Sequence, residues 1–217
     1  MNDALINVNG DQVQTLEILL LTTLVTLLPS IVVMMTSFTR IIISLSFLRT
    51  AMGTQNTPPN NVLVGISLFL TLFIMSPVIT QIQQTAYEPY VAQQISQEEA
   101  LNRAKVPLKQ FMLEQTETSS LEMYLDLSGA EMTEDPTQLP LRVIVPAFMT
   151  SELKRAFEIG FFLYIPFLLI DVIVSATLMS MGMIMLPPAT ISMPFKLLLF
   201  ITVDGWQLLF STLARGF

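Results

Sequence analysis

The sequence contains no cysteine and no histidine among its 217 residues, and only 12% of its residues are charged. Without cysteine there is no disulfide framework and no thiolate metal site. Without histidine the commonest catalytic base and metal ligand is missing. No glycine-rich phosphate loop occurs either, so nucleotide chemistry has no visible site. These absences exclude metalloenzymes and catalysis by cysteine or by a Ser–His pair.

Apolar residues dominate what is present. They make up 52% of the chain, whereas a soluble domain is about 25% charged. A helix of about 20 apolar residues can cross a bilayer, and the apolar segments run over 16–35, 62–82, 157–186 and 191–213. Pro29, Pro77 and Pro166 interrupt the first three of them, which favours packing against other subunits over simple lipid-facing spans. The prediction is an all-α integral membrane-assembly protein of two long broken helical hairpins.

Between the two hairpins lies a segment of different composition. Residues 85–151 hold ten acidic and four basic residues, so this segment has a net charge of −6, compared with −7 for the whole chain. Good helix formers with apolar residues three or four apart predict two or three short amphipathic helices, followed by an irregular stretch over 128–140. We therefore divide the chain into an N-terminal apolar hairpin (1–84), an acidic water-exposed insert (85–150) and a C-terminal apolar hairpin (151–217).

Few cations bear on topology. No cation precedes Arg40, so either a leader has been removed or the first apolar segment directs insertion. Arg40 and Arg49 lie between the first two apolar segments, in what we interpret as a short cytoplasmic loop. That orientation places the acidic insert on the periplasmic side of a bacterial inner membrane. Thr150 or Ser151 is the predicted cap of the third apolar helix.

The turn between the last two apolar segments is dense in methionine, at every second position from 179 to 185. Such spacing points side chains to one side of an extended chain but scatters them around a helix. Gly182, Pro187 and Pro188 argue against a continuous helix and are the expected loop-shaping residues. These methionines can also be ordinary lipid-facing or gap-filling side chains.

Charges within apolar segments are expensive and usually face protein or a water-filled path. The last two segments contain Glu158, Asp171, Asp204 and a single lysine, Lys196. One lysine cannot neutralise three acids, so pairing across a subunit boundary is one solution, with Lys196 reaching Glu152 of a neighbour. Another interpretation treats Asp171 and Asp204 as relay carboxylates of an ion-coupled solute transporter. The roles of these two acids stay open.

Four strings together resemble the FliP family of type III protein export apparatus proteins. The resemblance covers nearly the whole apolar part of the chain in the same order and is closer to the flagellar branch than to the virulence injectisome, which remains the alternative. The strings are MMTSFTRIII at 34–43, TPPNNVLVGISLFLTLFIMSPVI at 57–79, SELKRAFEIGF at 151–161 and GMIMLPPATISMPFKLLLFITVDGWQLL at 182–209.

The resemblance implies a pore-forming core subunit of the flagellar export gate that is not an enzyme and uses no cofactor and no metal. Five copies would form a ring together with FliQ and FliR subunits. Unfolded flagellar subunits would pass through it, and rod proteins would assemble on it. The positions matching the family's pore constriction are Met183, Ile184 and Met185. The resemblance also makes Glu152 and Lys196 a candidate inter-subunit ion pair. Further partners are other export apparatus proteins and membrane lipid, without nucleic acid. A purely structural scaffold for the rod is a third possibility.

Overall fold

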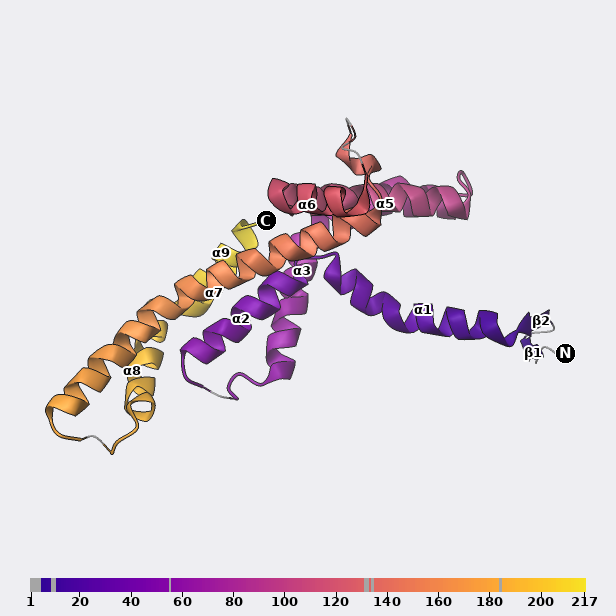
Figure 1. Cartoon of the computed structure of the whole chain (residues 1–217). Helices are drawn as coiled ribbons and strands as arrows, with labels where there is room; N and C mark the ends of the chain where they lie inside the picture. Colours follow the sequence, from indigo (N-terminus) through magenta and orange to yellow (C-terminus); the bar gives the residue numbers. More distant parts are fainter. Residues whose placement is uncertain (1–4, 9–10, 55, 131–132, 134, 184) are drawn as a thin grey trace.

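The computed structural model describes residues 5–8, 11–54, 56–130, 133, 135–183 and 185–217. Almost all of them are helical, which confirms the predicted all-α class (Figure 1). The exception is a small antiparallel hairpin of β1 (Leu5–Val8) and β2 (Asp11–Gln14) at the N-terminal end. It leads directly into α1 (Thr15–Met34), which projects away from the other helices (Figure 1).

The predicted loop that carries Arg40 and Arg49 is wrong, because these residues belong to helix α2 (Phe38–Ala51). The helix forms because Ile41, Leu45 and Leu48 recur with the spacing of one helix face, and all three are fully buried. Arg40 is buried as well, so it gives no information about which loop faces the cytoplasm.

Helix α3 (Asn60–Ile82) continues through the π-helical turn η1 (Gln83–Tyr87) into the short α4 (Glu88–Val91). Pro77 lies inside α3 without breaking it. Together these elements form one helical stretch of 32 residues that is long and apolar enough to span a membrane. The first hairpin is thus built from α2 and α3, which pack around a shared apolar core.

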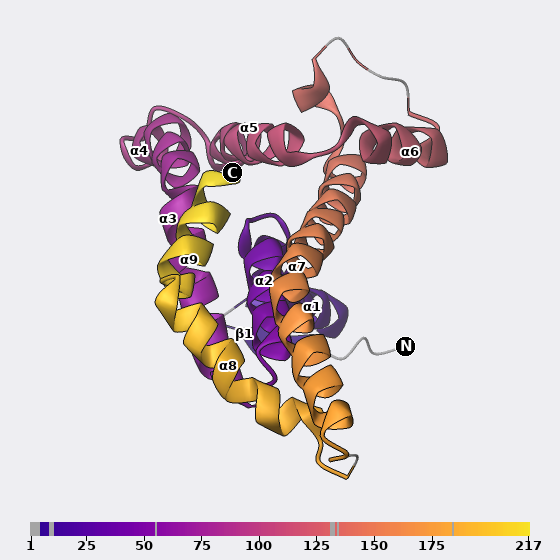
Figure 2. The same cartoon turned by 90° about the vertical axis from the view of Figure 1, so that its left-hand side faces the viewer.

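The acidic insert consists mainly of α5 (Gln97–Gln115) and α6 (Thr118–Ser128). Ser96 caps α5 by accepting a hydrogen bond from the backbone N–H of Glu99. The two helices lie across the upper ends of α3 and α7 (Figures 1 and 2). A short 3-10 turn, η2 (Pro136–Gln138), follows; there the Thr137 side chain and backbone N–H donate to Asp135 and lower its pKa.

Helix α7 (Leu141–Ser180) is a single helix of 40 residues, about 60 Å long. It begins at Leu141, so the predicted cap at Thr150 or Ser151 is wrong and both residues lie inside the helix. Pro166 does not interrupt it. One end of α7 packs in the apolar core of the insert, with Val143, Ala147 and Phe148. The other end leads into the methionine loop, Met181–Pro187.

The last apolar segment is bent rather than straight. Helices α8 (Pro188–Thr202) and α9 (Gly205–Arg215) meet at 62°. They run back toward the insert, α8 beside α7 and α9 beside α3, so α7, α8 and α9 form the second hairpin, with the methionine loop at its free end (Figure 2). Within the described ranges, two continuous helical stretches are long and apolar enough to span a membrane, or three spans if the bent pair counts as one.

Candidate functional site

The methionine loop, defined as Met181–Pro187, begins where α7 is closed by a left-handed residue. Gly182 has φ of 74°, a value that glycine adopts without steric cost. The N–H of Met183 donates to the carbonyl of Leu178 at 3.0 Å, and the N–H of Gly182 donates to that of Met179 at 3.1 Å. These two bonds are a Schellman ending. On the other side, Pro188 is the first residue of α8, where a missing N–H costs no hydrogen bond.

The methionine side chains around this loop do not pack into the core of the chain. Met179 lies in the last turn of α7, and Met181, Met183 and Met185 lie in the loop. All four are exposed, and Met185 is 97% exposed. Ile184, the third predicted constriction residue, lies outside the described residues. A single copy therefore leaves these four apolar side chains exposed at the end of the second hairpin.

Below the loop, Asp171 and Lys196 form an ion pair across the α7–α8 hairpin. The Lys196 Nζ donates to Asp171 Oδ2 at 2.6 Å, and the Ser192 Oγ donates to Asp171 Oδ1 at 2.6 Å. Lys196 is 6% exposed. Its Nζ also donates to the carbonyl of Ala51 at 3.0 Å, the last residue of α2. This arrangement assigns a partner to Asp171, whose role the sequence left open.

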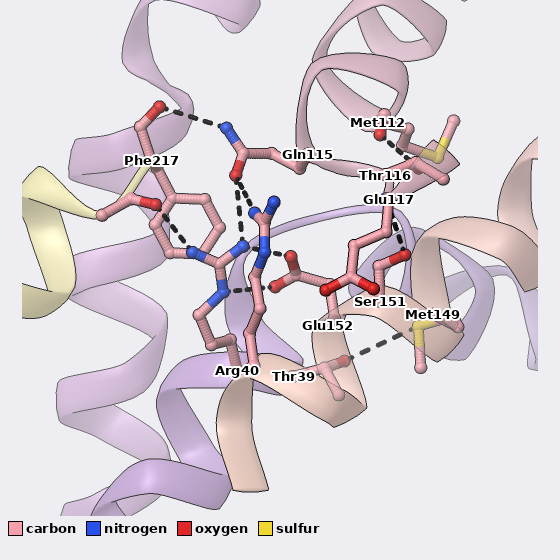
Figure 3. Close-up of polar contacts among 12 residues, drawn as sticks. Thr39, Arg40, Met112, Gln115, Thr116, Glu117, Met149, Ser151, Glu152 and Phe217 are labelled. Carbon is pink, nitrogen blue, oxygen red and sulfur yellow. Dashed lines mark hydrogen bonds and ion pairs between the residues drawn. The ribbon is translucent and has the colours of Figure 1, made fainter. Parts of the chain in front are cut away.

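A second buried ion pair joins Arg40 of α2 to Glu152 of α7 (Figure 3). The guanidinium is bidentate: Nε donates to Glu152 Oε2 at 2.9 Å, and Nη2 donates to Oε1. Arg40 Nη1 donates to the carbonyl of Gly216 at 2.8 Å, and the guanidinium lies over the Phe217 ring, 3.7 Å from its centroid. Such planar, bidentate pairing is specific to arginine.

Gln115, at the end of α5, completes this cluster. Its Oε1 accepts from Arg40 Nη2 at 3.2 Å and from Arg155 Nη1 at 2.8 Å, while its Nε2 donates to the carbonyl of Phe217 at 3.2 Å (Figure 3). A further hydrogen bond joins the start of α6 to α7: the N–H of Glu117 donates to Ser151 Oγ at 3.0 Å. The cluster thus joins the insert, both hairpins and the last residues of the sequence.

Within one chain, then, Glu152 pairs with Arg40 and Lys196 pairs with Asp171. The inter-subunit pairing of Glu152 with Lys196 stays a prediction, since it concerns contacts between copies. The ion pair between Arg40 and Glu152 does not follow from the sequence-based interpretation, because that interpretation places Arg40 in a loop. The apolar spacing of Ile41, Leu45 and Leu48 would have revealed the helix, and with it a buried arginine that needs an acid.

Asp204 lies at the break between α8 and α9 and not inside a helix. It is exposed and has φ of 51°, a left-handed value that aspartate and asparagine adopt more readily than other non-glycine residues. The next residue, Gly205, lies against the Phe200 ring. Asp204 is therefore associated with the helix break through its backbone conformation. Its side chain makes no capping hydrogen bond to α9.

The fold and the site together define a class of protein: an all-helical membrane-assembly protein whose second hairpin carries an exposed methionine loop. The chain belongs to the FliP family, whose family model matches residues 20–213. It is 53% identical to the flagellar biosynthetic protein FliP of Pectobacterium carotovorum over 96% of this chain and 82% of that protein. The corresponding proteins of Aquifex aeolicus and Bacillus subtilis are 47% and 48% identical, over 96% and 94% of this chain and 88% and 92% of theirs.

Proposed function

We propose that this protein is a core pore-forming subunit of the flagellar protein export gate and is required for flagellum assembly. Unfolded flagellar subunits would pass through a ring built from several copies, five by family resemblance, together with FliQ and FliR subunits. Family membership supports the flagellar role, since the relatives described above are named flagellar biosynthetic proteins. The chain acts as a channel component rather than as an enzyme.

The observation that carries the pore proposal is the exposure of the methionine loop at the free end of a long hairpin. Met183 and Met185 are large apolar side chains that one copy leaves in contact with its surroundings. In a closed ring the same loop from each copy meets at one axis. An apolar constriction excludes ions by dewetting, while unbranched thioether side chains adapt to different passing peptides.

We further propose that the assembly belongs to the bacterial inner membrane at the flagellar basal body, with the acidic insert on the periplasmic side. Because Arg40 is buried, Arg49 is the cation near the α2–α3 turn that supports a cytoplasmic position for this turn. Arg49 donates to the Asn60 side chain at 2.6 Å and to the carbonyl of Pro58 at 3.3 Å, so it is held at the turn itself.

The test is the double variant Met183→Ala/Met185→Ala in the assembled complex. Shorter side chains leave the constriction wider and easier to hydrate, so we expect ion leakage across the membrane while flagellar export continues. Met123→Ala is the matched control, because Met123 is an exposed methionine of the insert, far along the chain from the loop. A complex of normal composition whose membrane conductance is unchanged by the double variant would contradict the pore role.

A further inference from the structure

Asp171, Ser192 and Lys196 form a polar contact between α7 and α8, which we call the hairpin bridge. Asp171 lies nine residues before the end of α7, and Lys196 lies eight residues after the start of α8. At 1.5 Å per residue, both are about 12–14 Å from the methionine loop along their helices. The hairpin bridge therefore joins the two arms of the hairpin at nearly matched heights below the loop.

An open apolar groove of about 440 Å³ lies between α7 and α8 beside the hairpin bridge and extends toward the loop. Its walls are Ile170, Ile173, Val174, Thr177 and Leu178 of α7 and Ile191 and Phe195 of α8. Apolar contacts are non-directional, so a loosely packed groove does not fix the position of one arm along the other. Directional bonds must supply that register.

The hairpin bridge provides such bonds. Both carboxylate oxygens of Asp171 accept a bond from α8, each of 2.6 Å. The buried ammonium of Lys196 has Asp171 as its acid, and in a low-dielectric surrounding an unpaired buried charge is strongly unfavourable. Sliding α8 by one residue along α7 moves its side chains by about 1.5 Å and would break these short bonds together.

The hairpin bridge also reaches the first hairpin. Lys196 Nζ donates to the carbonyl of Ala51, one of the terminal carbonyls of α2 that have no partner within that helix. A cation at this place also interacts favourably with the negative end of the helix dipole. The same lysine thus fixes α8 both to α7 and to the end of α2.

We propose that Asp171, together with Ser192 and Lys196, is a positioning site that sets the register of α7 and α8 and so holds the methionine loop in its place. The proposal rests on the proposed pore function for its consequence: a loop out of register leaves the constriction open. Asp171 acts through its effect on the loop and needs no contact with exported protein. Its carboxylate is paired with Lys196 within the hairpin.

The register can be measured directly because the chain contains no cysteine. Met179→Cys and Thr190→Cys place two spin labels at exposed positions on α7 and α8, on either side of the loop. The labelled subunit is diluted with unlabelled subunit in the purified complex, and the distance distribution is recorded by pulsed electron paramagnetic resonance. We expect a narrow distribution for the parent and a broadened or shifted one for Asp171→Asn, which leaves Lys196 without its acid.

Three further variants make the result specific. Asp171→Glu keeps the charge and should restore most of the narrow distribution. Ser192→Ala removes one hydrogen bond but keeps the ion pair, so it should broaden the distance distribution less than Asp171→Asn does. If Asp171→Asn does not assemble, Ser192→Ala is the variant that tests the positioning role. Glu117→Gln is the matched control, because it breaks the exposed pair between Glu117 and Lys154, another ion pair of α7, and should leave the distances unchanged.

Distances that stay as in the parent in Asp171→Asn, or in Ser192→Ala if that variant alone assembles, would overturn the positioning role. A broadening that Glu117→Gln reproduces would overturn it as well. Membrane conductance is the second readout and should rise in Asp171→Asn. The two readouts separate the positioning role from the proposed pore function. Changed distances without a change in conductance support the positioning role and count against an ion-excluding constriction. The double methionine variant tests the constriction independently.

Discussion

At the scale of single residues, Arg40 illustrates how one buried charge determines the arrangement of several elements. Its guanidinium donates from Nε to Glu152, from Nη1 to the carbonyl of Gly216 and from Nη2 to Gln115. The side chains of Arg40 and Glu152 are 3% and 0% exposed. Replacing a whole buried pair with apolar residues is often neutral, but removing one partner leaves an uncompensated charge. The pair should therefore be sensitive to single substitution.

We predict that Arg40→Met destabilises the protein by about 3–5 kcal/mol, because Glu152 then keeps a buried charge without its partner. The double variant Arg40→Met/Glu152→Gln should recover part of this loss, since the neutral amide costs less to bury. Thermal unfolding in detergent measures both. Lys154→Met, which breaks an exposed pair, is the control and should change stability by less than about 1 kcal/mol. Equal losses in the single and double variants would contradict this account.

Single residues also show what the sequence can and cannot predict about the site. Gly182 and the two prolines bound the methionine loop because their effects on the backbone are local. The partners of Glu152 and Lys196 depend instead on which helices become neighbours. Asp171 is 25 residues from Lys196, and Arg40 is 112 residues from Glu152. Charge counting shows that partners are needed but cannot choose among the candidates.

At the scale of elements, apolar runs predicted helices well and their ends poorly. The second apolar segment, 62–82, coincides closely with α3. The third was placed too late, because the start of α7 lies in residues 141–150 that belong by composition to the acidic insert. Prolines were poor guides to breaks: α3 and α7 continue through Pro77 and Pro166, whereas the second hairpin bends at 203–204, where no proline occurs.

The bend between α8 and α9 depends on a close contact at Gly205. A methyl group there would lie 2.3 Å from the Phe200 ring. The ring has little room to move, because Trp206 packs against it with centroids 5.1 Å apart and Phe167 lies on it at 6.4 Å. We predict that Gly205→Ala lowers stability by about 1–3 kcal/mol, the usual effect of overpacking, as measured by thermal unfolding in detergent.

Gly65 provides the matched control for this element. It lies in α3, and a methyl group added there would have no neighbouring atom within 4 Å. Alanine is favoured over glycine inside a helix by about 0.5–1 kcal/mol, so Gly65→Ala should be neutral or slightly stabilising. If both alanine variants behave alike, the contact between Gly205 and Phe200 does not determine the bend.

At the scale of the whole molecule, apolar side chains cover much of the outer surface as well as the cores. Phe69 and Phe73 on α3 and Phe157, Phe161 and Phe162 on α7 are all exposed. A second groove, of about 500 Å³, lies between α7 and the α8–α9 bend and is also almost wholly apolar. Exposed apolar surface on this scale marks contact with lipid or with other proteins. One copy alone therefore leaves its main surfaces without a partner.

These surfaces lead to a prediction about assembly. A ring of several copies buries the flanks of each hairpin and brings the methionine loops together, whereas an ion-coupled transporter needs neither. We expect the protein, purified in mild detergent together with the proposed FliQ and FliR subunits, to have the mass of a large hetero-oligomer with several copies of this chain. Mass measurement of the intact complex counts the copies. A monomer or small oligomer that binds a solute would instead favour the transporter interpretation, in which the exposed helices face lipid.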